Sequence, residues 1–330
     1  MPRFYSFLPA ALAEGRPFAL GIISGVNGSS PQKLGAKALF FEDGRIVGTL
    51  GGGCLEAEVQ DRARRALRTG EAATFELVLD HDFGWDDGLI CGGKVRGLIL
   101  PRAAEAAALW HALAEGGGKL TWGVRKDFAI VRDDACAAHE WRYREVVEPP
   151  CALWIAGSGH VAQSVAKLAS QLDFEVTVFD DRATFATTQF FPEGTRFRIG
   201  YWDDLLQAAL PGRPTFGLVV TRGHNRDALV LRRWIHEPFA FLGMIGSRRK
   251  ARLILGQFRD EQLATEDEIA RVQCPVGVDI GAVSVPEIGV SVVAEFIRRR
   301  AALAARAAQA GPDADANASA CEAGEAATVS

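Results

Sequence analysis

The sequence contains little cysteine, and its cysteines lack the spacings that mark metal or disulfide sites. Six cysteines are spread over 330 residues, at positions 54, 91, 136, 151, 274 and 321. None forms a Cys-x-x-Cys pair, which excludes a zinc ribbon and a thioredoxin-like motif. A chain of this length can bury its own core without a disulfide framework. We therefore expect reduced cysteines and a cytoplasmic protein.

Long apolar runs and a strong excess of one charge are also missing. No run approaches the roughly 20 apolar residues of a membrane span. The apolar stretch from Phe4 to Ala13 contains Pro9 and is too short for a signal peptide, so it predicts an amphipathic helix. The formal net charge of −4 excludes a chain-wide attraction to nucleic acid or anionic membranes. We expect neither as a partner.

The first part of the chain, residues 1–146, carries the pattern of an N-terminal α+β domain. Short apolar segments bounded by turn residues predict strands, and apolar residues at three- and four-residue spacing predict helices. We expect strands at 18–24, 38–41, 45–50, 74–79 and 95–100, helices at 55–68 and 103–114, and a hairpin near 120–131.

A stiff Glu148-Pro149-Pro150 segment marks a linker at 147–150. Strands then alternate with helical patterns, at 152–156, 175–179, 196–199, 216–220 and 239–244. This alternation predicts a Rossmann-like, doubly wound parallel sheet over residues 151–300. The alanine-rich tail, 301–330, is expected to extend the last helix at its start and to be disordered beyond Pro312.

A glycine-rich turn opens the second domain between its first strand and first helix. Gly157, Gly159 and Ala162 fit the pattern G-x-G-x-x-G/A. Asp180, followed by Arg182, stands where dinucleotide-binding proteins place the acid for a ribose hydroxyl. The turn therefore predicts a phosphate-bearing ligand, with a nucleotide among the candidates. The alternative is that the turn serves only the fold.

Two histidines are candidate proton-transfer groups if the domain belongs to an NAD(P)-dependent oxidoreductase. His160 lies within the glycine-rich turn, where contact with a phosphate is the better interpretation. His224 follows the strand that ends at Val220, at the edge of the sheet where ligands bind. Alternatively, His224 and Asp227 cap the next helix.

Two cysteines stand beside glycines in the first domain. Cys54 follows Gly52 and Gly53 at the beginning of a helix, where the dipole stabilises a thiolate. Cys91 precedes Gly92 in a second loop of the same character. The pair indicates soft-metal or sulfur chemistry, and the alternative for each cysteine is a small buried apolar residue.

A basic run follows the last strand of the second domain. Ser247, Arg248, Arg249 and Lys250 come directly after Gly246. Their cations can bind anionic oxygens, although in isolation the run is more typical of a solvated helix start.

Taken together, these motifs resemble the xanthine dehydrogenase accessory protein family, XdhC/CoxI, over about residues 15–300. The resemblance is carried in order by Gly28-Ser29-Ser30-Pro31, Gly48-Thr49-Leu50-Gly51-Gly52-Gly53-Cys54-Leu55-Glu56, Cys91-Gly92-Gly93, Gly157-x-Gly159-His160-Val161, Asp180-Asp181-Arg182, Thr221-Arg222-Gly223-His224, Ile245-Gly246-Ser247-Arg248-Arg249-Lys250, Cys274-Pro275-Val276-Gly277-Val278-Asp279-Ile280-Gly281-Ala282 and Pro286-Glu287-Ile288. Ala162, Cys274, Val276 and Val278 depart from the family's usual residues without touching its charged motifs.

The resemblance implies a carrier for the molybdenum cofactor (molybdopterin-bound molybdenum) rather than an enzyme. Such a chaperone protects the cofactor while a cysteine desulfurase-type sulfurase installs its sulfido ligand. It then inserts the cofactor into apo-xanthine dehydrogenase or a related molybdenum hydroxylase. Homodimers are expected of the family and of Rossmann domains. A pure docking adaptor that binds partners without cofactor is a third hypothesis.

The implied cofactor-binding residues come from both domains, with Cys54 as a candidate molybdenum ligand. They are Gly52, Gly53, Cys54 and Cys91 in the first, and Gly157, Gly159, His160, Asp180, Arg182, His224, Ser247, Arg248, Arg249 and Lys250 in the second.

Overall fold

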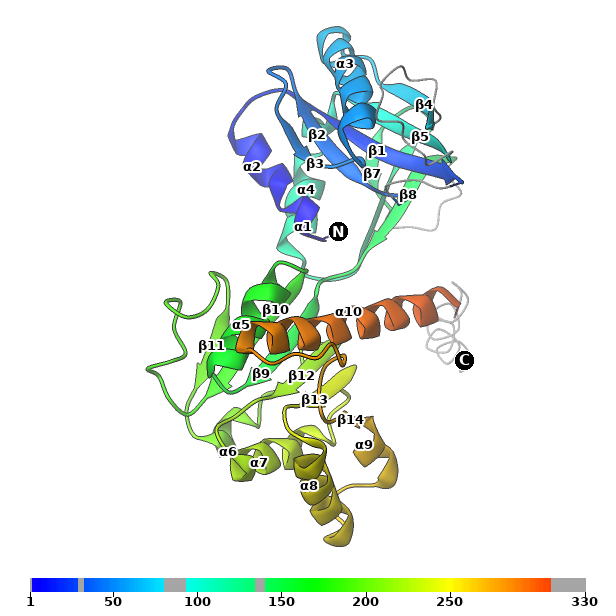
Figure 1. Cartoon of the computed structure of the whole chain (residues 1–330). Coiled ribbons are helices and arrows are strands. Elements are labelled where there is room, and N and C mark those ends of the chain that lie inside the picture. The colour runs from blue at the N-terminus through cyan, green and yellow to red at the C-terminus, as the bar shows by residue number, and fades with distance from the viewer. Residues whose placement is uncertain (1, 29–32, 80–92, 134–139, 310–330) are drawn as a thin grey trace, which may run out of the picture. The chain divides into compact units, whose positions relative to one another are not determined.

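The computed structural model describes residues 2–28, 33–79, 93–133 and 140–309. The chain divides into two compact units, residues 1–150 and 151–330. The first has mixed helices and antiparallel strands, and the second has a parallel sheet with helices (Figure 1). The predicted α+β domain and Rossmann-like domain are both confirmed.

The described residues of unit 1 form two antiparallel sheets. The larger has the order β3-β2-β1-β5-β4, and the smaller has the order β7-β6-β8. Its elements are α1 (Pro2–Tyr5), α2 (Phe7–Ala13), β1 (Phe18–Asn27), β2 (Lys37–Phe41), β3 (Ile46–Gly48), α3 (Gly53–Thr69), β4 (Ala73–Leu79), β5 (Gly93–Leu100), the 3-10 helix η1 (Ala103–Ala106), α4 (Ala107–Glu115), β6 (Leu120–Arg125), β7 (Ile130–Arg132) and β8 (Trp141–Val147).

Both faces of the larger sheet of unit 1 are buried. Every position in the first half of β1 is apolar, so alternate side chains contribute to a core on each face. Leu20 and Ile22 point into a core shared with α2, α4 and the smaller sheet. Ala19 and Ile23 point into a second core, where α3 packs through Val59 and neighbouring residues. Alternate residues of one strand therefore fill two cores.

A buried ion pair ties β2 to β8 in unit 1. The ammonium of Lys37 lies 2.6 Å from the Glu145 carboxylate and donates a hydrogen bond to the carbonyl oxygen of Gly35. The hydroxyl of Tyr5 donates to the same carboxylate at 2.6 Å. These contacts give the buried lysine a partner for its charge and fix the end of the segment that precedes β2.

Unit 2 is built on a six-stranded parallel sheet in the order β11-β10-β9-β12-β13-β14. Numbered from the start of the unit, this is 3-2-1-4-5-6, the order of dinucleotide-binding Rossmann folds. Its elements are β9 (Cys151–Ala156), α5 (His160–Ser170), β10 (Phe174–Asp180), β11 (Arg196–Ile199), α6 (Trp202–Leu205), β12 (Thr215–Val219), α7 (His224–Trp234), β13 (Phe241–Met244), α8 (Arg248–Asp260), α9 (Glu266–Arg271), β14 (Val272–Gln273) and α10 (Val285–Gln309).

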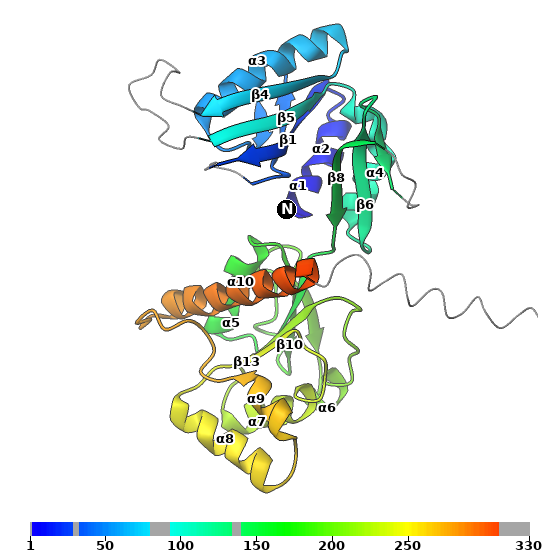
Figure 2. The ribbon, with the colours of Figure 1, turned by 90° about the vertical axis from the view of Figure 1, so that its right-hand side faces the viewer.

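Helices cover both faces of this sheet. On one face α5 and α10 lie side by side (Figures 1 and 2) and bury Val165 and Phe296 against the strands. On the other face α7 and α8 bury Trp234 and Phe258. The strand residues on both faces are apolar, as expected of a parallel sheet with two helical layers.

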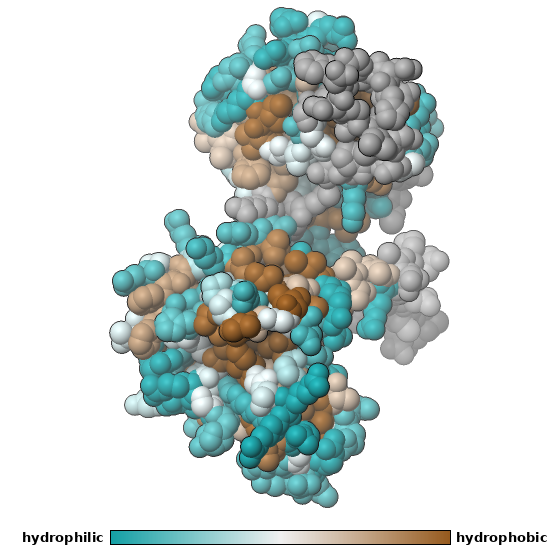
Figure 3. All heavy atoms as spheres, in the orientation of Figure 1, coloured by the Kyte–Doolittle hydropathy of each residue, from teal (hydrophilic) through white to brown (hydrophobic). Residues whose placement is uncertain are grey.

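The surface of unit 2 is uneven in polarity. Figure 3 shows hydrophilic side chains over α8 and apolar side chains where α10 lies. Val283, just before α10, is 87% exposed, and Val290 within α10 is also exposed. No helix in the described part of the chain is both long enough and apolar enough to span a bilayer.

Candidate functional site

The pocket that best matches the sequence motifs lies at the carboxyl edge of the parallel sheet in unit 2. The chain leaves β9 toward α5 on one face and leaves β12 toward α7 on the other, so the two loops diverge between neighbouring strands. Ligands of doubly wound folds bind at this divergence. A pocket of about 310 Å³ occurs there, lined by Gly159, His160, Gln163, Arg182, Phe185, Val220, Thr221 and Arg222.

The two glycines of the turn have different structural roles. Gly157 has φ +114°, and a Cβ on it would lie 2.4 Å from the carbonyl oxygen of Val220. Gly159 has φ −71°, and a Cβ on it would meet no atom within 4 Å. The first glycine therefore lets the turn pass close to the neighbouring strand. The second leaves open space at the beginning of α5, beside the pocket.

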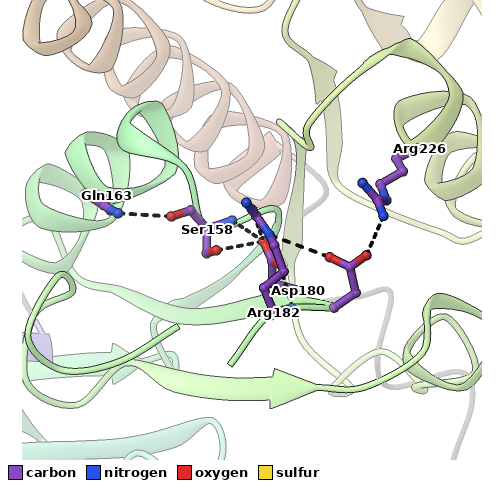
Figure 4. Close-up of polar contacts among 6 residues, drawn as sticks. Ser158, Gln163, Asp180, Arg182 and Arg226 are labelled. Atoms are coloured by element: carbon purple, nitrogen blue, oxygen red, sulfur yellow. Dashed lines mark hydrogen bonds and ion pairs between the residues drawn. The ribbon is translucent and has the colours of Figure 1, made fainter. Parts of the chain in front are cut away.

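Asp180, at the end of β10, is buried beneath this turn and accepts hydrogen bonds from two sides (Figure 4). Ser158 donates its backbone N–H and its hydroxyl to Oδ2, both at 2.7 Å. Arg182 donates Nε to Oδ1 at 2.9 Å and Nη2 to Oδ2 at 3.0 Å, and its backbone N–H also reaches Oδ1. The carboxylate thus joins the glycine-rich turn to the residues that follow β10.

These contacts determine the ionisation of Asp180. Burial disfavours its charged form, but the hydrogen bonds from Arg182 and Ser158 outweigh burial and hold the pKa below its ordinary value. The carboxylate is 1% exposed and is absent from the pocket lining. The predicted contact between Asp180 and a ribose hydroxyl stays a prediction, and the structure shows the acid engaged by its own chain.

The pocket lining carries positive charge and no carboxylate. It includes the guanidinium groups of Arg182 and Arg222 and the imidazole of His160. Arg222 is exposed and forms no ion pair with any described residue. The nearby carboxylate of Asp181 is bound at 2.8 Å by Arg226 (Figure 4). An anionic ligand therefore fits the pocket best.

A second buried acid organises the loop after β12. Asp227 is fully buried and accepts the backbone N–H and the hydroxyl of Thr221 at 2.9 and 2.7 Å. It also binds the ammonium of Lys250, which donates a further hydrogen bond to the carbonyl oxygen of Ile245. Lys250 therefore links α8 to α7, a role that its place in a basic run did not predict.

The remaining predicted residues of unit 2 lie at the same edge of the sheet, outside the pocket lining. Ser247 caps α8 by accepting the backbone N–H of Lys250, and Arg248 and Arg249 are exposed in its first turn. His224 is exposed at the beginning of α7. Of the predicted residues, the pocket lining thus brings together Gly159, His160 and Arg182.

In unit 1, the predicted Cys54 loop leads into α3. Gly52 caps the helix with φ +123°, and a Cβ there would meet nothing within 4 Å. Cys54 is the second residue of α3, so its backbone lies in the first turn, but its side chain is outside the described part of the structure. Cys91 is also outside the described residues. Within the residues described, no three His, Cys, Asp or Glu side chains are placed to hold a metal ion.

Several residues of the pocket wall were not predicted from the sequence. Gln163 lies one turn into α5 and donates to the carbonyl oxygen of Ser158 at 3.0 Å. Phe185 is 41% exposed although it lines a pocket. Arg222 stands in a recognised motif, in which only its neighbour His224 was predicted to bind. The sequence feature that could have identified Phe185 is an aromatic residue five positions after Asp180.

Comparison with known proteins gives consistent results. Residues 153–296 match the XdhC Rossmann domain, and residues 11–80 match the XdhC and CoxI family. Uncharacterized protein YqeB of Escherichia coli (strain K12) is 30% identical over 295 residues, covering 88% of this chain. The chain spans only 46% of the length of that protein.

Two further relatives match over most of their own length. A probable xanthine dehydrogenase subunit of Bacillus subtilis (strain 168) is 25% identical, with 91% of this chain and 98% of that protein covered. Molybdenum cofactor insertion chaperone PaoD of Escherichia coli (strain K12) is 26% identical, with 88% and 85% covered.

A solved structure has the same fold. A crystal structure described as a xanthine dehydrogenase from Bacillus halodurans superposes with a TM-score of 0.77 at 25% identity. The match covers 90% of this chain and 96% of that one. With family matches in both units and this shared architecture, the chain belongs to the XdhC and CoxI family.

Proposed function

We propose that this protein is a molybdenum cofactor-binding chaperone that inserts the cofactor into a xanthine dehydrogenase-type molybdenum hydroxylase. The observation that supports this most is the pocket at the carboxyl edge of the unit 2 sheet, whose lining has two arginines and no carboxylate. The cofactor is a pterin with a phosphate, and such a pocket suits an anion attached to a flat ring. A relative named for molybdenum cofactor insertion supports the same role.

The proposal assigns a candidate residue set to each unit by itself. Gly159, His160 and Arg182 of unit 2 bind the phosphate end. In unit 1, Cys54 in the first turn of α3 is the proposed thiolate ligand for the molybdenum. Protection of the cofactor during sulfuration, a sulfurase partner and homodimer formation belong to the same proposal.

The test is the quantity of molybdenum and of fluorescent oxidised pterin retained by the purified protein. We expect both to be retained together. Cys54→Ser should retain at least about tenfold less molybdenum than the unaltered protein, because a hydroxyl is a poor ligand for soft metals. Cys321→Ser, in the alanine-rich tail, is the matched control and should retain the metal.

Unchanged molybdenum retention in Cys54→Ser would remove this residue from the site. Absence of molybdenum and pterin from the unaltered protein, with tight NAD(H) binding and a substrate-dependent absorbance change, would contradict the proposal. That result would favour an NAD(P)-dependent oxidoreductase, which the strand order of unit 2 also suits.

A further inference from the structure

β10 ends at an acid, Asp180, that is buried, and the cation two residues later, Arg182, lines the pocket instead. In NAD-binding proteins a carboxylate at this position accepts a ribose hydroxyl, whereas an arginine nearby accommodates a phosphate on the same sugar. Here the Asp180 carboxylate accepts five hydrogen bonds, two from Ser158 and three from Arg182. A free diol would find no vacant acceptor on Asp180.

Arg182 is held in place by the acid and still offers part of its guanidinium to the pocket. Its Nε and Nη2 bind Asp180, while Nη1 has no hydrogen-bond partner among the described residues. The side chain is 27% exposed and belongs to the pocket lining. Asp180 therefore orients the arginine, and one N–H edge remains for an anion from outside.

An aromatic ring and a second cation complete the arrangement. The guanidinium carbon of Arg182 lies 5.0 Å from the ring centroid of Phe185, which is 41% exposed. Arg222, on the loop after β12, lines the same pocket. Exposed aromatic rings beside arginines bind flat heterocycles by stacking, and two arginines suit a phosphomonoester, which carries about two negative charges.

We propose that this pocket selects a ligand with a phosphomonoester at Arg182 and Arg222 and a flat ring system against Phe185. It discriminates against a ligand that presents a free sugar diol at the same position. Two sources share this chemistry: the phosphorylated pterin of the molybdenum cofactor, and an adenine dinucleotide with a 2′-phosphate. The inference rests on the proposed function in taking the pterin as the first of these.

The experiment uses the full chain and two matched ligand pairs. The pairs are NADP⁺ with NAD⁺, and the oxidised phosphopterin released from molybdenum cofactor with its dephosphorylated form. Calorimetric titration should show the phosphorylated member of at least one pair binding at least about tenfold more tightly. Discrimination in the pterin pair assigns the pocket to the cofactor, and discrimination in the nucleotide pair assigns it to a separate nucleotide.

Two variants test the assignment to particular residues. Arg182→Gln and, independently, Arg222→Gln should each reduce the preference for phosphate to below about threefold. Arg226→Gln is the control, because it removes the same charge from a neighbouring residue that pairs with Asp181 and does not line the pocket. Arg222 has no partner among the described residues, so its replacement tests the proposal even if Arg182→Gln unfolds.

The inference is overturned if neither pair shows a preference for its phosphorylated member. It is also overturned if the preference persists in Arg222→Gln or in a folded Arg182→Gln. Retention of molybdenum and pterin by the same preparation separates this failure from failure of the proposed function.

Discussion

Replacing Gly159 with alanine should leave unit 2 folded and weaken ligand binding at least about tenfold. The backbone of Gly159 is extended at ψ 177°, so alanine fits without strain, and its methyl group would meet no protein atom. That empty space borders the pocket, where a ligand phosphate would approach the beginning of α5. A tenfold loss corresponds to about 1.4 kcal/mol, and titration with the phosphopterin measures it.

Gly157→Ala is the matched substitution with the opposite result. A methyl group there would meet the carbonyl oxygen of Val220 at 2.4 Å, and φ +114° is unfavourable for alanine. We expect a loss of roughly 2–5 kcal/mol in the free energy of unfolding, from backbone strain and overpacking together. Thermal unfolding of both variants checks the pair. A stable Gly157→Ala, or a Gly159→Ala with unchanged affinity, would contradict the assigned roles.

The second large effect is expected for Asp180→Ala, which should destabilise the protein by about 3–5 kcal/mol. The substitution removes the acceptor of the Ser158 N–H and hydroxyl and the two carboxylate contacts of the Arg182 guanidinium, which keeps only its 3.7 Å approach to Asp181. Buried donors without acceptors carry the full cost of desolvation. Denaturant unfolding measures the loss.

Asp181→Ala is the control, since this neighbouring carboxylate is 23% exposed and pairs with Arg226 at the surface. Exposed ion pairs contribute only about 0–1 kcal/mol. Equal effects of the two substitutions would show that the buried network of Asp180 is not what stabilises the turn.

The lowered pKa of Asp180 adds a pH dependence with a definite sign. A carboxyl whose folded pKa lies below its unfolded value, about 3.9, stabilises the fold above that value. The stabilisation is lost as the pH falls through the folded pKa. Asp180→Ala should therefore lose less stability than the unaltered protein when both are acidified below about pH 4.

The glycine-rich turn was predictable because its sequence pattern and its structural context coincide. A glycine spacing of this kind needs a strand before it and a helix after it, and both were evident from apolar periodicity around Gly157 and Gly159. The parallel sheet followed from alternation of strands and helices. These features depend on local sequence, which is why reasoning from local patterns recovered them.

Features that depend on partners distant in sequence were not predictable in the same way. The partners of Asp180 and Lys250 are set by tertiary packing, so the positions of these residues in the sequence did not indicate the buried contacts that each makes. Strand β8 (Trp141–Val147) was missed because charged residues alternate with its aromatic ones, and only Tyr143 within it is buried. Its pairing with β6 joins the expected hairpin into a three-stranded sheet.

The most direct test of the account is transfer of the cargo. Protein loaded with molybdenum cofactor is incubated with an apo-form of a xanthine dehydrogenase-type hydroxylase, and molybdenum, pterin and hydroxylase activity are followed together. We expect molybdenum and pterin to leave this chain in equal amounts while the acceptor gains activity, and Gly159→Ala to transfer little because it retains little. An acceptor that gains activity equally from free cofactor and from the loaded protein, or cargo that never leaves the chain, would contradict the account.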